Sequence, residues 1–124
     1  MTIVRADQAP TFELPGTTFT GYASPSRGSS DVCTWRITLA PGLRSDQAHQ
    51  LDRDEIFMVA AGSITLTPDG EPLLPGDTAV VPAGRPIAVG NPGDVPAEVY
   101  IAIAAGFTAT MADGTVVGTP PWAQ

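Results

Sequence analysis

The chain has 124 residues and a formal net charge of −7, from thirteen acidic residues, six arginines and no lysine. A chain this acidic repels phosphate backbones and anionic lipid, so we expect neither nucleic acid nor a membrane surface as a partner. The absence of lysine also excludes Schiff-base chemistry on a side-chain amine.

The length is that of one domain with one modest core. We expect a single domain over residues 1–124, with a core at about 32–105, N-terminal strands at 12–23 and a C-terminal tail at 112–124. The single cysteine, Cys33, cannot form an internal disulfide, which is typical of a reducing compartment. No run of 18 apolar residues and no signal-peptide pattern is found, so we expect a soluble, cytoplasmic protein.

The longest apolar-periodic segments run five to eight residues and end at Gly or Pro, which favours strands and leaves little room for helices. Dipeptides such as Asp69-Gly70, Pro75-Gly76 and Ala83-Gly84 predict turns between them. So many short strands indicate an all-β closed barrel or sandwich. The expected strands are 12–14, 18–23, 32–39, 56–60, 63–68, 78–81, 87–90, 98–104 and, most weakly patterned, 107–111.

The C-terminal tail contains Pro120, Pro121 and Trp122. A large amphipathic ring at the end of a stiff segment can anchor the tail across a barrel mouth or a subunit boundary. A frayed terminus is the alternative interpretation.

Residues 42–62 read G-L-R-S-D-Q-A-H-Q-L-D-R-D-E-I-F-M-V-A-A-G. This segment resembles the first signature of the cupin superfamily: glycine, histidine-x-histidine, a short spacer, glutamate, six residues and glycine. His49 matches the first histidine and Glu55 the glutamate. Leu51 stands where the family has its second histidine.

The second cupin signature, G-x5-P-x-G-x2-H-x3-N, is matched by Gly76, Pro82, Gly84 and Asn91, with Ile87 where the histidine belongs. Together the two signatures and the hairpin between them cover about half of the chain. The resemblance implies a small β-barrel of cupin type, a double-stranded β-helix or jelly roll. We interpret the asparagine as a turn residue that hydrogen-bonds its own backbone.

Cupins that bind iron, manganese, nickel or zinc use two histidines and a glutamate from the first signature and a histidine from the second. Leu51 and Ile87 have no lone pair to donate, which leaves His49 and Glu55 where a catalytic metal needs at least three protein donors. The polar residues next to them have the opposite strand parity. We therefore expect no tightly held transition metal and no cofactor.

Alternate side chains share a face of a strand, so His49, Leu51, Arg53 and Glu55 point to one side if the segment is extended. In an apolar lumen, desolvation would raise the pKa of Glu55, and a charged imidazolium nearby would lower it again. These two residues are then candidates for a general acid/base pair. They could also be relics that satisfy each other, or could recruit an ion or cofactor.

An apolar pocket with few polar groups is the usual form of a small-molecule site. By strand parity its candidate lining comprises Trp35, Leu51, Arg53, Phe57, Ile87 and Val89. The apolar members of this set equally describe a filled core. Arg53 is interpreted either as an inward anion-binding group or as the partner of a nearby acid at the strand mouth.

Ile56 and Met58 have the parity opposite to Glu55 and should face outward. Outward apolar residues on a small barrel need cover, and cupins resemble one another in pairing barrels through such a sheet. We therefore expect a homodimer.

The fold alone does not determine function, because cupin barrels host many activities. With two metal ligands missing, O₂-activating chemistry is disfavoured. The leading hypothesis is a metal-independent enzyme that isomerises, cyclises or dehydrates a small, mostly apolar, carbonyl-bearing metabolite. The alternatives are a non-catalytic module that binds or senses a hydrophobic metabolite, and a metal-dependent cupin with an irregular ligand set. The lysine-free composition is typical of GC-rich bacterial genomes, in which small cupins often accompany secondary metabolism.

Overall fold

The computed structural model describes residues 1–68 and 70–124. Over these residues it contains eleven β-strands and two short 3₁₀ turns, so the prediction of an all-β chain is confirmed. Asp69, in the expected turn Asp69-Gly70, lies outside the described residues. Within the described part of the chain, no helix is both long and apolar enough to cross a membrane.

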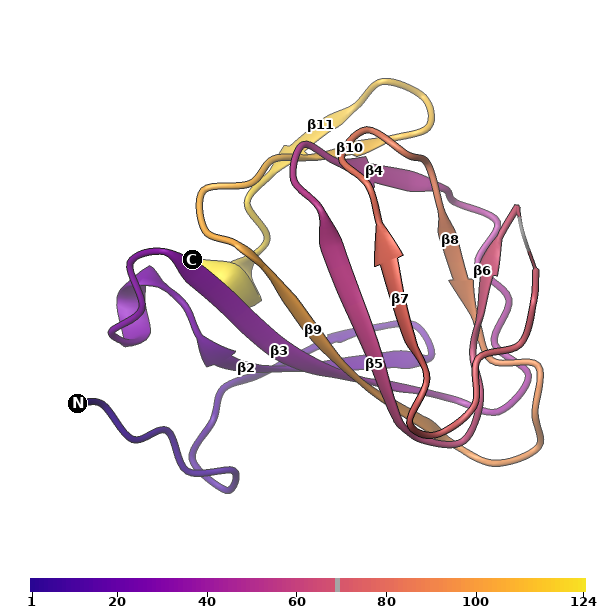
Figure 1. The fold of residues 1–124 in the computed structure, drawn as a ribbon, viewed down its shortest axis with the longest axis horizontal. Coiled ribbons are helices and arrows are strands. Elements are labelled where there is room, and N and C mark those ends of the chain that lie inside the picture. Colours follow the sequence, from indigo (N-terminus) through magenta and orange to yellow (C-terminus); the bar gives the residue numbers. More distant parts are fainter. Residues whose placement is uncertain (69) are drawn as a thin grey trace.

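One face of the barrel is a six-stranded antiparallel sheet in the order β1-β2-β3-β9-β5-β7 (Figure 1). The two longest strands, β3 and β9, pair along their whole length at its centre. Both alternate buried and more exposed residues, as expected when one face of a sheet covers a core. The strands are β1 (Thr11–Leu14), β2 (Thr17–Ala23), β3 (Val32–Leu39), β5 (Glu55–Ala61), β7 (Thr78–Val81) and β9 (Ala97–Ala104).

The opposite face consists of β11-β10-β4 and the pair β6-β8. Backbone hydrogen bonds between His49 and Ile87, at 2.8 and 2.9 Å, join these two pieces into one layer. The strands are β4 (His49–Leu51), β6 (Thr65–Thr67), β8 (Ala88–Gly90), β10 (Ala109–Met111) and β11 (Val116–Gly118). The 3₁₀ turns are Pro25–Arg27 and Pro121–Ala123.

The hydrophobic core lies between the two layers. The inner face of β3 contributes Cys33, Trp35, Ile37 and Leu39, which are between 0 and 5 % exposed. Residues of β9, β5 and β7 continue this face, and Leu51 with the residues around β8 and β10 packs against it from the other layer. Two facing sheets that enclose one core agree with the all-β barrel or sandwich that the strand pattern predicted, and with the jelly roll that the cupin resemblance implied.

All nine expected strands are present, with ends shifted by up to two residues. Two further strands, β4 and β11, were not expected. The predicted alternation through residues 49–55 was wrong in one respect, because the chain turns at 52–54 and passes from one layer to the other. His49 and Glu55 therefore belong to facing sheets rather than to one strand.

Two signature residues have clear structural roles. Gly62 has a φ of +70°, and a Cβ there would lie 2.6 Å from the carbonyl oxygen of Pro96, so only glycine fits this turn. Asn91 is 1 % exposed, and its Oδ1 accepts a hydrogen bond from the Gly93 N–H at 2.9 Å. Its amide also donates to the carbonyl of Leu39 at 3.2 Å, which ties the turn to the end of β3.

Candidate functional site

Glu55 is the first residue of β5 and points into the barrel. It pairs across the sheet with Ile103 on one side and Val81 on the other, and both of these side chains are buried. Only 5 % of Glu55 is exposed, and no hydrogen bond reaches its carboxyl group from the described residues. Burial raises its pKa from 4.5 to about 8, because desolvation penalises the charged carboxylate.

His49 lies on the opposite layer, as the first residue of β4. Its backbone is held between Ile87 on one side and Met111 on the other. Directly paired residues project to the same face of a sheet, so the imidazole shares its side with the buried Ile87 and, two residues along, with Leu51. His49 is half-buried, and burial lowers its pKa from the ordinary value of 6.5.

These two shifts leave both groups uncharged at neutral pH: Glu55 as a carboxylic acid and His49 as neutral imidazole. The expectation that a charged His49 would pull the pKa of Glu55 down again was wrong, because burial acts on both groups and disfavours the imidazolium. A protonated acid and a free imidazole nitrogen are the forms that a general acid and a general base need before turnover.

Five of the six predicted lining residues belong to one hydrophobic cluster. Four are at most 7 % exposed, and the fifth, on β8, is half-buried and packs against them. They are Trp35, Leu51, Phe57, Ile87 and Val89. The structure therefore assigns them a packing role, and contact with a ligand stays a prediction.

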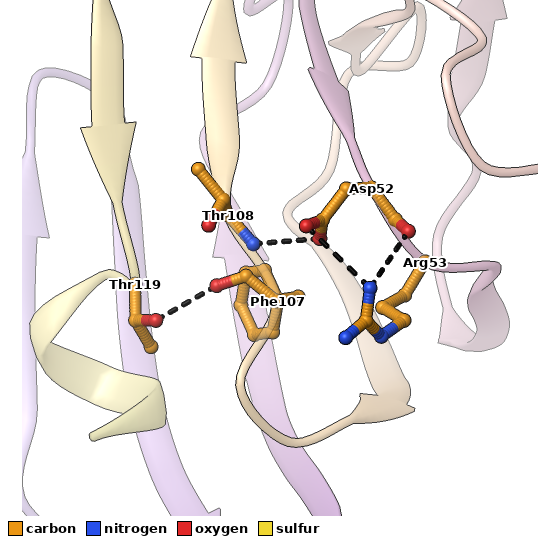
Figure 2. A network of polar contacts seen from close by, with 5 residues as sticks. All are labelled: Asp52, Arg53, Phe107, Thr108 and Thr119. Atoms are coloured by element: carbon orange, nitrogen blue, oxygen red, sulfur yellow. Dashed lines mark hydrogen bonds and ion pairs between the residues drawn. The ribbon is translucent and has the colours of Figure 1, made fainter.

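Arg53 lies apart from this cluster, on the exposed corner between β4 and β5. Its Nη1 donates to the carbonyl oxygen of Asp52 at 3.2 Å and lies 3.5 Å from the carboxylate of the same residue (Figure 2). This arrangement matches the interpretation of Arg53 as the partner of a nearby acid. The inward orientation that strand parity suggested is absent because the strand ends at Leu51.

The donor set does not fit the metal centre of metal-binding cupins. His49 and Glu55 are the matching ligands, and Leu51 and Ile87 fill the other two positions with alkyl groups. Across residues 1–68 and 70–124, no group of three or more His, Cys, Asp or Glu side chains is placed to hold an ion. Three protein donors are the minimum for such a site.

Two surface pockets lie away from these residues. One of about 360 Å³ is lined by Ala48, Thr67, Pro68, Arg85 and Pro86. Ala48 and Pro86 adjoin His49 and Ile87 in sequence, so on extended backbone they face the outer side of the layer. The second, of about 260 Å³, is lined by Thr2 and Val4 of the N-terminal segment and by residues 22–23 and 27–29. Neither pocket is lined by His49 or Glu55.

The strand pattern missed the importance of Phe107. This residue is 1 % exposed, and its ring stacks on Trp35 with centroids 5.8 Å apart. The next residue, Thr108, donates its N–H to Asp52 Oδ1 at 2.7 Å, which places the loop beside the corner that leads to Glu55 (Figure 2). One sequence feature could have indicated this role: Gly106 follows the end of β9 by two residues, has a φ of +80° and directly precedes an isolated aromatic residue.

Comparisons with known proteins agree with this architecture. The chain is similar in structure to the polyketide cyclase RemF from Streptomyces resistomycificus, with 18 % identity, a TM-score of 0.74 and coverage of 84 % of this chain and 79 % of that one. It is also similar to a sugar phosphate isomerase of the cupin superfamily from Silicibacter pomeroyi, with 25 % identity, a TM-score of 0.67 and coverage of 89 % and 81 %.

A third similar structure is salicylate 1,2-dioxygenase from Pseudoaminobacter salicylatoxidans, with 16 % identity and a TM-score of 0.68; the match covers 83 % of this chain and 31 % of that one. No curated protein matches the sequence. The sequence pattern of the family described as "Cupin domain" matches residues 35–103, which is more than half of the chain. The chain therefore belongs to the cupin family.

Proposed function

We propose that this cupin is a metal-independent enzyme that moves protons on a small, mostly apolar, carbonyl-bearing metabolite, with Glu55 as general acid and His49 as general base. The observation that carries the proposal is the state of Glu55, a carboxyl group inside an apolar core without a hydrogen-bond partner among the described residues. A buried, unpaired ionisable group costs folding free energy, and such groups concentrate at functional sites.

The chemistry follows from the two uncharged groups. The imidazole of His49 removes a proton from the carbon next to the substrate carbonyl, and Glu55 gives its proton to the carbonyl oxygen, which forms a neutral enol. In a substrate with a β,γ double bond, the imidazolium returns its proton to the γ-carbon of the dienol while the enol hydroxyl returns its proton to Glu55, which completes an isomerisation. Attack of the enol carbon on a second carbonyl forms a ring, with the imidazolium proton passing to the new alkoxide and the enol proton returning to Glu55. In a dehydration, a β-hydroxyl takes the imidazolium proton and leaves as water.

Two comparisons support this class of reaction. The similar structure at 25 % identity is described as a sugar phosphate isomerase, and isomerisation by proton transfer needs one acid and one base. The similar cyclase has the same fold. The apolar surroundings of Glu55 here favour a less polar substrate than a sugar phosphate.

The test uses hydrogen–deuterium exchange at carbon, which needs no knowledge of the natural substrate. The protein is incubated in D₂O with a panel of small ketones and β-keto thioesters, and loss of the α-proton signal is followed by NMR. We expect exchange that falls at least about 100-fold in Glu55→Gln and in His49→Gln. The rate should also fall above pH 8, where Glu55 loses its proton, and below the lowered pKa of His49.

Glu13→Gln is the matched control, because Glu13 is an exposed carboxylate on β1. Unchanged exchange in that variant, with loss in Glu55→Gln, supports the assignment. Equal exchange in all variants would refute it.

The second candidate is a non-catalytic module that binds or senses a hydrophobic metabolite. The apolar interior around Trp35 and Phe57 favours it, because apolar and aromatic side chains are the usual lining of a site for a hydrophobic ligand. Saturable binding of a panel compound that is equal in wild type and Glu55→Gln, with no exchange in either, would select this candidate.

We also propose that the protein is a homodimer. The outer face of β5, β7 and β9 presents Ile56, Met58, Val80 and Tyr100, of which the last three are 39, 61 and 38 % exposed. Arg36 lies opposite Tyr100 on the same face, and its buried Nε lacks a hydrogen-bond partner in the described structure. A second copy on this face would cover the apolar side chains.

A further inference from the structure

One end of the barrel is closed by two segments that belong to neither main sheet. The first is the loop 105–108 between β9 and β10, and the second is the C-terminal segment 119–124. In Figure 1 they lie close together beside the start of β3. We refer to them together as the closure.

Aromatic contacts hold the C-terminal segment against the barrel. The indole of Trp122 stacks on Phe19, with ring centroids 3.8 Å apart and an interplanar angle of 13°. Phe12 and Trp35 flank the indole at 6.3 and 6.5 Å. The tail is therefore docked on the barrel rather than frayed.

Apart from one side-chain contact with Cys33 of β3, the polar contacts of the segment go to turns and loops. Arg27 Nη2 donates to the carbonyl of Trp122 at 2.7 Å, and Ser24 Oγ donates to the carbonyl of Gln124 at 3.1 Å. Thr119 Oγ1 donates to the carbonyl of Phe107 at 2.7 Å, which links the two parts of the closure (Figure 2). The segment can thus leave without breaking a sheet.

The closure covers the end of the barrel at which Glu55 lies. Cys33, Ile103 and Glu55 form one row across β3, β9 and β5. The Cys33 thiol donates a hydrogen bond to the carbonyl of Ala123 at 3.4 Å, so the tail lies directly over one end of this row. On the other side, Thr108 of the loop is bonded to the corner that precedes Glu55.

The docked indole of Trp122 lacks one hydrogen bond. Its Nε1–H is buried and finds no acceptor among the described residues. An N–H that loses its water without gaining a partner costs free energy, and exposure on opening restores that water. The docked state is therefore less stable than its aromatic contacts alone would make it.

From these contacts we propose that the closure is a removable lid: the C-terminal segment swings away with Trp122, the loop with Phe107 follows, and the interior beside Glu55 opens to a ligand. That the lid admits a substrate rests on the proposed function of Glu55. That the lid opens does not rest on it, because opening occurs in the protein without a ligand and exposes Cys33.

Cys33 is the single cysteine and is 0 % exposed, so its reaction with iodoacetamide reports opening. The labelling rate is measured on the native full chain and normalised to that of the urea-unfolded chain. We expect a wild-type rate that changes little at low urea, because local opening exposes little surface. Trp122→Ala should raise it more than about tenfold, and Thr119→Val, which removes one hydrogen bond, about fivefold.

Val59→Ala is the matched control, since Val59 is buried toward the other end of β5 and its truncation lowers global stability without touching the closure. Faster labelling in the two closure variants but not in Val59→Ala supports the lid. If Trp122→Ala does not fold, Thr119→Val decides. The proposal is overturned if labelling always follows the urea dependence of global unfolding, or if neither closure variant labels faster than Val59→Ala. Because no substrate is used, this result is separate from that of the exchange experiment.

Discussion

Glu55 occupies the glutamate position of the first cupin signature, but its neighbours across the sheet, Ile103 and Val81, are apolar. In metal-binding relatives a carboxylate at this position would be neutralised by a cation, whereas here Leu51 and Ile87 stand at two of the ligand positions. Without that compensation, the carboxyl group keeps its proton to about pH 8. Glu55 thus lowers the free energy of unfolding when it is ionised, and this effect can be measured as a function of pH.

The folded state binds one more proton at Glu55 than the unfolded state between pH 4.5 and about 8, so stability falls as pH rises through this window. Glu55→Gln cannot lose a proton and lacks this slope. The free energy of unfolding of the variant relative to wild type should therefore rise by about 3 kcal/mol between pH 4.5 and 7. Urea denaturation at several pH values measures it. Glu13→Gln, at an exposed position, should show no such trend, and parallel pH profiles for Glu55→Gln and wild type would contradict the protonated state.

The corner between β4 and β5 could be predicted from the sequence only in part. Strand parity correctly predicted that the side chains of Leu51 and Glu55 face inward, because each residue follows the alternation of its own strand. The change of layer between them depends on carboxylate contacts to distant loops: Asp52 with the N–H of Thr108, and Asp54 with that of Ala83 at 2.9 Å. Contacts across such sequence separations leave no local pattern.

The same reasoning explains the two unexpected strands. β4 and β11 have three residues each and pair with β10, so their extended form depends on tertiary contacts more than on propensity. The long central strands β3 and β9, by contrast, alternate clearly and were predicted to within one residue.

Loss of the Asp52 carboxylate should loosen this corner. Asp52→Ala leaves the Thr108 N–H without its 2.7 Å acceptor, and we expect the free energy of unfolding to fall by about 1 kcal/mol. Asp94→Ala removes an exposed carboxylate elsewhere and should change stability by less than about 0.5 kcal/mol. Thermal or urea unfolding compares the three proteins. Equal stabilities for the two variants would mean that the corner is held by other contacts.

The signature glycines and the strand lengths were sufficient to predict the barrel. Docking of the Trp122 tail across a barrel mouth was one of the interpretations that the sequence allowed. The contacts that Phe107 and Trp122 make were not predictable, because they depend on aromatic packing between segments far apart in the chain. The outer face of the six-stranded sheet follows from parity alone and underlies the proposed dimer.

Met58→Glu tests that dimer. Met58 pairs with Tyr100 on the outer face, and a two-fold interface would bring two new carboxylates into apolar surroundings. We expect the wild type to sediment as a dimer at micromolar concentration and the variant to have a dissociation constant at least about tenfold higher. Val116→Glu, at an exposed site on β11, should remain dimeric. A monomeric wild type would disprove this arrangement.

The most direct measurement is the titration of the Glu55 carboxyl group by ¹³C NMR on glutamate-labelled protein, with its signal assigned by its absence in Glu55→Gln. The titration is repeated after chelator treatment. We predict one midpoint near pH 8 in both samples, because burial alone sets the pKa. A carboxylate already ionised at pH 7, whether through water access or through a bound cation that the chelator removes, would contradict the assignment of Glu55 as a general acid.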